Sequence, residues 1–235
     1  MTNKAASPRT RLVHLALKPA SLALGRQAQK SITTQRAVLD ATIRCLVQLG
    51  YTQTTMECIA DSAKISRGAI MHHYDSRADV IAHAAEYLAE RRLQEFENQV
   101  CIKLAPVAGE SPGLPSFRRA AELVMRYYEL PSFIALHELL LAARTDIAIR
   151  PLMRKIEKHI GTRMLAQIAT HMPYWKSMPD TEAVLTDLLH FLSRGVALSH
   201  PNKLDRKRLG TLLDLVSEIA HQRYLDKSKP ALAAR

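Results

Sequence analysis

Aromatic residues, cysteines and long apolar runs are all scarce in this sequence of 235 residues. Hydrophobic residues make up 47% of the chain, but only four residues are Phe and one is Trp. That composition favours helices packed through Leu, Ala, Ile and Val over an aromatic-rich β-protein. No run of 18 apolar residues occurs, so we expect no transmembrane helix and no membrane partner. The three cysteines, Cys45, Cys58 and Cys101, lack metal-ligand spacing and fit a reducing, cytoplasmic setting.

The sequence also lacks the motifs on which a prediction of catalysis could rest. It contains no GxSxG, no glycine-rich phosphate loop and no evident pair of catalytic carboxylates, so we expect no enzyme, no catalytic residue and no cofactor. The run HELLL at residues 137–141 begins like a zinc motif, but Leu141 stands where the second His is required, so no metal site is expected. The histidines of the second half are interpreted as core-edge or pocket residues: His137, His159, His171, His190 and His200.

Positive charge is abundant. Lys and Arg number 33 against 22 Asp and Glu, which gives a formal net charge of +11. Residues 1–80 contain 11 basic and 5 acidic residues, a net charge of +6, so about half of the excess lies in the first third of the chain. A basic balance speaks about partners and not about fold, and by itself it leaves DNA, RNA and an anionic membrane open.

The first third of the chain predicts a basic arm and a small helical domain. Residues 1–32 contain no acidic residue and several scattered Lys and Arg, which predicts a flexible basic arm. In the domain at residues 33–80, apolar residues recur at helical spacing over 34–49, and Gly50 can end that helix. Thr54 and Glu57 have the form of a capping box at the start of a second helix. Ser66 can cap a short third helix.

The remainder predicts a larger helical domain at residues 81–226 and a tail at 227–235. A long helix runs from about Arg77 to Val100, and residues 105–115, with three Pro and two Gly, predict a loop. Further helices are predicted at residues 116–129, 132–144, 150–172, 180–199 and 204–225. No segment alternates convincingly as a β-strand does, so the predicted fold class is all-α.

The stretch TTMECIADSAKISRGAIMHHYDSRADVI, residues 54–81, indicates a helix-turn-helix. Two short helical patterns are joined by a break of about three residues, and polar residues lead the second. Free backbone N–H groups at a helix start favour phosphate, and short polar side chains there can reach base edges in the major groove. Arg67 could donate two hydrogen bonds to guanine, and Gly68 and Ala69 are small enough for close approach.

The run GYTQTTMECIADSAKISRGAIMHHYDSRADVI, residues 50–81, resembles the DNA-binding domain of the TetR family of transcriptional regulators. The family pattern is Gly-Tyr, Thr-Thr, Ile-Ala, Ser-x-Gly, an aromatic, His and Phe or Tyr, then Ser-Lys. The close resemblance covers residues 34–81, and ELLLAARTD at 138–146 is similar to a segment common in the ligand-binding half of such proteins. The resemblance implies an N-terminal three-helix DNA-binding domain and a C-terminal helical ligand-binding and dimerisation domain. It also implies that the protein is a homodimer that binds a double-stranded DNA operator.

Position by position, the resemblance implies a set of DNA contacts. Lys64 occupies a turn position usually filled by Gly, where left-handed geometry costs on the order of 1 kcal/mol. Met71 stands where the family commonly has a phosphate-binding Tyr, so that contact is lost or moved. The remaining contacts are Thr55 at the start of the second helix, Ser66, Arg67, Gly68 and Ala69 facing the groove, His72 and His73 reaching phosphates, and Arg77 in place of the usual Lys.

The resemblance also implies a small-molecule effector bound among the middle helices. Candidate pocket residues, chosen for position and chemistry, are Met125, Tyr128, Phe133, His137, Met153, Trp175 and His190. The predicted function is a sequence-specific DNA-binding transcriptional regulator, a repressor released from its operator by the effector. The alternative is a DNA-binding protein without such an effector, either nucleoid-associated or a corepressor-independent regulator.

Two apolar stripes on the last two helices are candidates for the dimer interface. The resemblance implies that these helices form a four-helix bundle between subunits, and the alternative is that the stripes form an intramolecular core. The stripes comprise Leu185, Leu188, Leu189, Leu192 and Val196 on one helix and Leu209, Leu212, Leu213, Val216 and Ile219 on the other.

Overall fold

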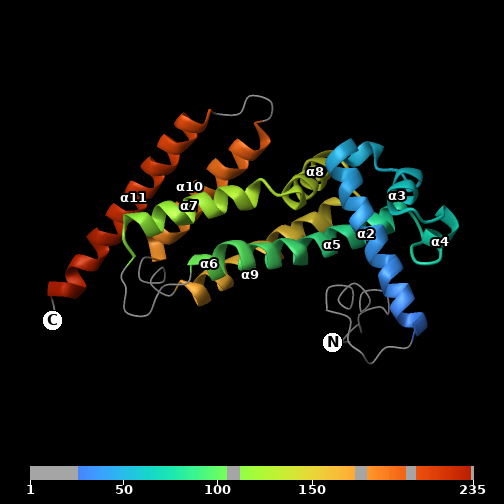
Figure 1. Cartoon of the computed structure of the whole chain (residues 1–235), viewed down its shortest axis with the longest axis horizontal. Coiled ribbons are helices and arrows are strands. Elements are labelled where there is room, and N and C mark those ends of the chain that lie inside the picture. Colours follow the sequence, from blue (N-terminus) through green and yellow to red (C-terminus); the bar gives the residue numbers. More distant parts are fainter. Residues whose placement is uncertain (1–25, 105–111, 173–178, 200–204, 234–235) are drawn as a thin grey trace. The chain divides into compact units, whose positions relative to one another are not determined.

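The computed structural model describes residues 26–104, 112–172, 179–199 and 205–233. Every element formed by these residues is helical (Figure 1), which confirms the predicted all-α class. None of the described helices is long and apolar enough to cross a membrane. Residue contacts divide the chain into two units: the first unit contains the chain up to Arg92 together with Pro131–Gly161, and the second contains Leu93–Leu130 and the chain from Thr162.

The first unit contains the predicted three-helix domain and further helices that pack with it. Its elements are α2 (Arg26–Gln53), α3 (Met56–Ala63), α4 (Arg67–Met71), most of α5 (Arg77–Phe96), α8 (Pro131–Thr145) and the first half of α9 (Arg150–His171). Helix α8 packs against α2, so this division differs from the predicted boundary at residue 80. The periodicity of α8 shows an apolar face but not which helix covers it, and the sequence therefore could not place it.

Helix α2 begins earlier than predicted and is interrupted near its end. Residues 26–32, which the sequence assigned to a flexible arm, are the first turns of this helix, and the rest of that arm lies outside the described residues. Gly50 has φ 76° and ψ 174°, which stops the regular helix where the sequence predicted. Positive φ is readily adopted only without a Cβ, so this position requires glycine.

The start of α3 corrects the predicted capping box. The N-cap is Thr55 and not Thr54, because the Thr55 hydroxyl accepts from the backbone N–H of Cys58 at 3.2 Å. Thr54 is fully buried and its hydroxyl donates to the carbonyl of Gly50 at 2.7 Å. Threonine is a good N-cap residue at either position, and the spacing of Thr54 to Glu57 favoured Thr54, whose side chain is buried and hydrogen-bonded to Gly50 instead.

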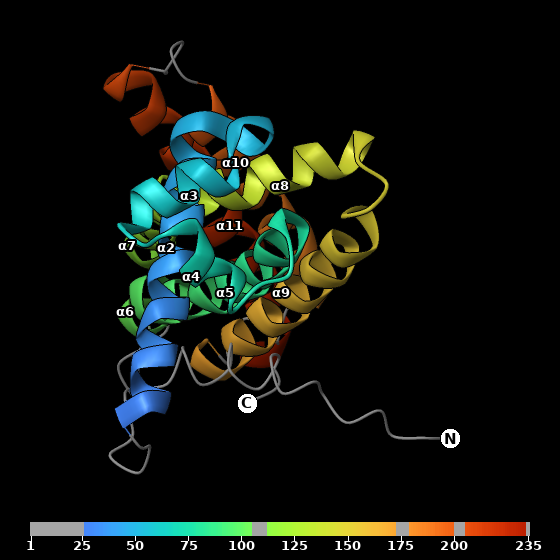
Figure 2. The ribbon, with the colours of Figure 1, turned by 90° about the vertical axis from the view of Figure 1, so that its right-hand side faces the viewer.

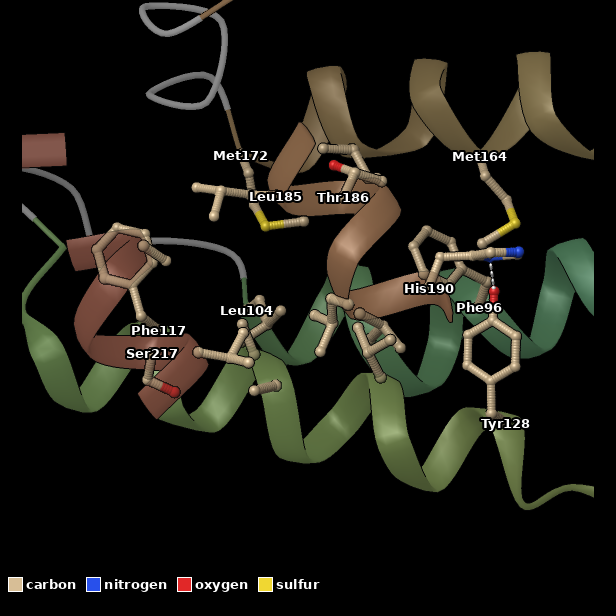
Figure 3. Close-up of a pocket in the computed structure, with 18 residues that line it drawn as sticks. Phe96, Leu104, Phe117, Tyr128, Met164, Met172, Leu185, Thr186, His190 and Ser217 are labelled. Atoms are coloured by element: carbon tan, nitrogen blue, oxygen red, sulfur yellow. Dashed lines mark hydrogen bonds between the residues drawn. The ribbon is translucent and has the colours of Figure 1, made fainter. Parts of the chain in front are cut away.

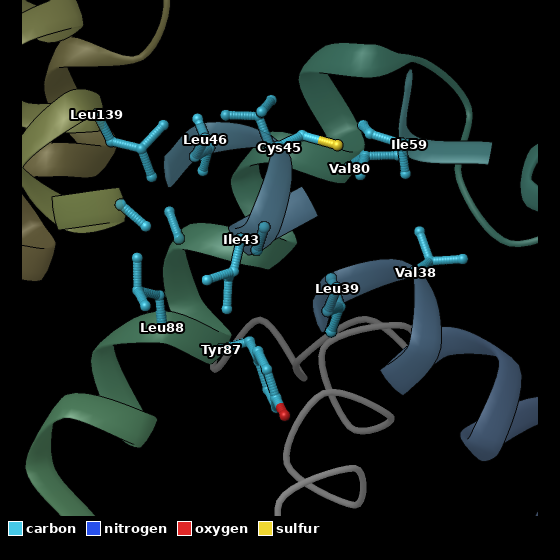
Figure 4. Close-up of a cluster of buried hydrophobic side chains, with 14 of the residues drawn as sticks. Val38, Leu39, Ile43, Cys45, Leu46, Ile59, Val80, Tyr87, Leu88 and Leu139 are labelled. Atoms are coloured by element: carbon cyan, nitrogen blue, oxygen red, sulfur yellow. The ribbon is translucent and has the colours of Figure 1, made fainter. Parts of the chain in front are cut away.

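One apolar core holds the first unit together. Val38 and Leu46 of α2, Ile59 of α3, Val80 of α5 and Leu139 of α8 are fully buried and lie close together (Figure 4). Burying one such side chain contributes about 1.5–3 kcal/mol. Helices α3 and α4 are thus fixed to a large core, although α4 itself is short.

The second unit is a separate helical assembly. After α5 the backbone forms one π-helical turn, η1 (Glu97–Cys101), and a short α6 (Ile102–Leu104). The long helices are α7 (Leu114–Tyr128), the last part of α9, α10 (Pro179–Leu198) and α11 (Arg206–Ala233). These bounds agree with the predicted helices to within a few residues, except that α11 continues past residue 225 into the predicted tail.

The predicted apolar stripes of α10 and α11 are divided between two faces. Leu185 is buried with Phe117 and Ala220, and Leu213 is buried with Ala121 and Met125, so these members form an intramolecular core. Leu188 and Ile219 are exposed. Each helix therefore has an apolar face packed inside the chain and further apolar side chains in solvent, a division that a single stripe did not predict.

Candidate nucleic-acid interface

A tight turn joins α3 to α4 and is built as the sequence predicts. Lys64 ends α3 with φ 57° and ψ 41°, and its backbone N–H donates to carbonyls of the helix that it ends. Ser66 caps α4 by accepting from the N–H of Ala69 at 3.2 Å. The left-handed conformation of Lys64 and the cap at Ser66 are therefore confirmed. Together they fix the direction in which α4 leaves the turn.

Helix α4, which follows α3 along the chain (Figure 2), has one buried side and one exposed side. Ile70 is fully buried in the core of the first unit, while Arg67, Gly68 and Met71 are exposed and Ala69 is partly exposed. A Cβ added at Gly68 would meet no atom within 4 Å, so the fold itself does not require glycine there. Beside Arg67, the exposed side of α4 thus carries the small residues Gly68 and Ala69. Small side chains at this place would let the helix approach the base edges of a groove closely.

Arg67 forms an ion pair with Glu57 that the sequence did not reveal. The Arg67 guanidinium lies 2.5 Å from a Glu57 carboxylate oxygen, and both side chains are more than 60% exposed. Glu57 accepts from its own backbone N–H, and that bond together with Arg67 lowers the pKa of its carboxyl group. The two residues are ten apart on different helices, so only the turn geometry brings them together.

The two histidines that follow α4 have different surroundings. His72 is exposed, whereas His73 is partly buried, with Gln35 Nε2 at 3.4 Å from His73 Nδ1. Burial, and then the neighbouring His72, lowers the pKa of His73, which therefore favours the neutral ring near neutral pH. A phosphate contact by His73 would accordingly be a neutral hydrogen bond and not an ion pair.

Arg77, one of the predicted DNA contacts, is held by hydrogen bonds within the protein. Its Nε donates to the carbonyl of Thr54 at 2.6 Å, and its Nη2 donates to the carbonyl of Tyr51. Its guanidinium also lies over the Tyr51 ring, 4.5 Å from the ring centroid. The resemblance implied a DNA contact for Arg77, and the sequence pattern did not reveal that the carbonyls of Tyr51 and Thr54 accept from its side chain.

An apolar pocket lies inside the second unit (Figure 3). It has a cavity volume of about 110 Å³, and most of its walls are apolar side chains of η1, α7, α9, α10 and α11. The predicted effector residues Tyr128 and His190 both line it, and the Tyr128 hydroxyl is hydrogen-bonded to His190 Nδ1.

Four other predicted effector residues do not line this pocket. Met125 is buried beside it in the same unit, while Phe133, His137 and Met153 belong to the first unit, where the Phe133 and His137 rings stack. Trp175 lies outside the described residues. The lining residues Phe96, Phe117 and Met164 were not predicted, because one apolar face of a helix gives no sign that it borders a cavity. No group of three or more His, Cys, Asp or Glu in the described part of the chain could hold a metal ion.

The chain is similar to known proteins both in sequence and in structure. Residues 38–84 match the family described as "Bacterial regulatory proteins, tetR family". An uncharacterised HTH-type transcriptional regulator of Mycobacterium tuberculosis (strain ATCC 25618 / H37Rv) is 28% identical over 174 residues, which cover 73% of this chain and 85% of that protein.

Two solved structures show the same fold. A protein of Mesorhizobium loti MAFF303099 assigned to the TetR family superposes with a TM-score of 0.64 at 16% identity, covering 83% of this chain and 96% of that one. The multidrug binding protein EbrR, complexed with imidazole, superposes with a TM-score of 0.51 at 18% identity, covering 77% and 93%. With the helix-turn-helix and its exposed recognition helix, these matches support a TetR-type DNA-binding domain at residues 38–84, in a chain that has the fold of solved TetR-family regulators.

Proposed function

We propose that this regulator is a homodimeric repressor that reads its operator with α4 and is released by a small molecule bound in the second unit. The DNA-reading part rests on the exposed side of α4, where Arg67 can address a base edge and Gly68 leaves room for the groove. The effector part rests on the apolar pocket, since concave apolar sites with a few polar groups are the usual sites of small ligands. EbrR, a multidrug binding protein, has the same fold.

Release requires the ligand to favour a conformation that cannot span the operator. One continuous helical segment leads from the helix-turn-helix to the pocket, because α5 begins at Arg77 and continues directly into η1, whose Val100 lines the pocket. A ligand can move this equilibrium only by its difference in affinity for the two conformations, and moving it from 1:99 to 99:1 takes about 5.5 kcal/mol.

The reading role is tested by Gly68→Leu. Because a Cβ at this position meets nothing and Leu forms helix better than Gly, the variant should fold with unchanged or slightly higher thermal stability. In the groove the added side chain should collide with DNA, so affinity for a duplex selected from a random pool should fall at least 100-fold. Gly161→Leu in α9, which also meets nothing, is the matched control and should bind normally. Equal binding by the two variants would show that α4 does not enter the groove.

Dimerisation is assigned to the exposed apolar side chains of α10 and α11. Val184, Leu188 and Phe191 follow one another at helical spacing and are 65%, 42% and 65% exposed, and Leu215 and Ile219 on α11 are 52% and 40% exposed. Exposed apolar rows of this kind mark association surfaces. Phe191→Asp should produce a monomer in sedimentation velocity, while the control Ile147→Asp, at a side chain that is 75% exposed elsewhere, should remain a dimer. A dimeric Phe191→Asp protein would exclude this face.

A further inference from the structure

The helix-turn-helix carries little of the positive charge that attracts DNA. In residues 54–76, two residues are basic and three are acidic: Lys64, Arg67, Glu57, Asp61 and Asp75. Residues 1–53 contain eight basic residues and one acidic residue. Phosphates attract cations whatever the base sequence, so the charge that binds DNA without selectivity is carried mostly by residues before α3.

The arginine of α4 is paired with a carboxylate of α3. Arg67 is the first residue of α4, Glu57 belongs to the first turn of α3, and Arg67 Nη1 lies 2.5 Å from Glu57 Oε1. The two side chains are 63% and 61% exposed, and ion pairs on the surface contribute little to folding. The pair therefore lies beside Gly68 on the surface assigned to DNA, where the fold itself has little need of it.

The Glu57 carboxylate is held by groups of α3 as well as by Arg67. It accepts from its own backbone N–H, and that hydrogen bond, then Arg67, and also the Thr55 hydroxyl lower the pKa of the carboxyl group. The free N–H groups at a helix start favour a negative charge in the first turn. Glu57 is therefore ionised near neutral pH and gives Arg67 a counter-charge with a defined place on α3.

An arginine that is paired in this way keeps donors for DNA. A guanidinium has more N–H groups than a single ion pair uses, so Arg67 can bond to Glu57 and to a guanine edge at the same time. The pairing restricts the directions in which the remaining N–H groups point, which lowers the entropy lost on binding. It also places a negative charge beside the guanidinium, and this charge repels a phosphate but not a neutral base edge.

We propose that Glu57 is a positioning residue for DNA reading: its carboxylate orients Arg67 toward a base edge and weakens the attraction of α4 to DNA of any sequence. The inference rests on the proposed reading role of α4 and adds the residue that makes Arg67 selective. Removal of Glu57 should have two opposite effects, because Arg67 loses its orientation while the surface beside α4 loses a negative charge. A residue with only a structural role would weaken binding to all sequences when it is removed.

The test is a double-mutant cycle of Glu57→Ala and Arg67→Ala in the full chain. Fluorescence anisotropy gives the affinities for a duplex selected from a random pool, for its single-base variants and for an unrelated duplex. The base pair read by Arg67 is the one at which Arg67→Ala lowers discrimination, which a bidentate contact raises roughly 5- to 150-fold. Glu57→Ala should lower discrimination there about threefold or more, and should strengthen binding to the unrelated duplex about two- to fivefold at low salt. In the Arg67→Ala background, Glu57→Ala should not change discrimination further.

Asp61→Ala is the matched control, because Asp61 is an exposed carboxylate one turn further along α3 and is not the partner of Arg67. It should leave discrimination at the Arg67 base pair unchanged, and circular dichroism checks that every variant folds. The positioning role is wrong if Glu57→Ala keeps full discrimination or weakens binding to all duplexes alike. It is also wrong if Arg67→Ala relaxes no base pair, or if Asp61→Ala acts as Glu57→Ala does.

Gly68→Leu separates this inference from the proposed function. Loss of DNA binding in Gly68→Leu, together with full discrimination in Glu57→Ala, would overturn the positioning role and leave groove reading by α4 intact. Normal binding by Gly68→Leu would overturn groove reading by α4, and the positioning role with it.

Discussion

Arg77 provides the sharpest test of how α3 and α4 are held in place. A contact with DNA phosphate and a role in holding the fold predict opposite results when Arg77 is replaced. If it contacts phosphate, its removal weakens DNA binding without affecting the fold. In the structure its guanidinium instead donates to the carbonyls of Thr54 and Tyr51 and lies over the Tyr51 ring. Thr54 is fully buried, so its carbonyl has little access to water if the arginine is removed.

The magnitude follows from those contacts. A hydrogen bond to a charged group contributes about 1.5–3 kcal/mol, and an exposed cation–π contact about 0.5–1 kcal/mol. Because Arg77 is itself partly exposed, water can replace part of the stabilisation from these hydrogen bonds. We therefore expect Arg77→Met to lower the local stability of α3 and α4 by about 2–4 kcal/mol. Amide hydrogen exchange in residues 56–71 should accelerate about 30- to 1,000-fold, since 1.4 kcal/mol corresponds to a factor of ten.

Two arginines serve as controls in the same measurement. Arg67→Met removes an exposed ion pair and should leave exchange in α3 and α4 within a fewfold of the original rate. Arg150 donates to the carbonyls of Ala143 and Arg144 at the end of α8, so Arg150→Met should accelerate exchange there and not in α4. Unchanged exchange in Arg77→Met, together with a DNA-binding salt dependence lowered by about one charge per half-site, would restore the phosphate role and refute the structural one.

Two further predictions concern stability. Lys64→Gly should raise the free energy of unfolding of the first unit by about 1 kcal/mol or less in urea titrations, because the left-handed conformation at φ 57° is relieved while Gly also gains freedom in the unfolded chain. A decrease would mean that the Lys64 side chain stabilises the turn. Burial raises the pKa of Tyr74 above its ordinary value of 10.0, so its contribution is complete below pH 10 and is lost as the pH rises further. The free energy of unfolding should therefore fall less steeply between pH 9 and 11 in Tyr74→Phe than in the original protein. An unchanged slope would show that ionisation of Tyr74 does not cause the loss of stability.

The sequence predicted the elements better than their contacts. Helical spacing and capping residues located nearly every helix because they are local signals, as with the cap at Ser66 and the left-handed Lys64. The hydrogen bonds of Arg77 were not predicted because their acceptors are carbonyls 23 and 26 residues away. The pocket was only partly predicted for the same reason: Tyr128 and His190 are 62 residues apart, and periodicity cannot show that two helical faces leave a space between them.

The two stretches that resemble the TetR family, residues 34–81 and 138–146, are brought together by packing in the first unit. Gly50 lies against the second stretch, since a Cβ there would approach the Glu138 carboxylate to 3.2 Å. The hydroxyl of Tyr51 donates to Asp146 at 2.7 Å, and this bond lowers the pKa of the Asp146 carboxyl group. Tyr51 also receives Arg77 on its carbonyl and on its ring. One aromatic residue thus joins the end of α2, the start of α5 and the connection after α8. If a ligand displaces α5, we expect Tyr51 to transmit that motion to the turn before α3.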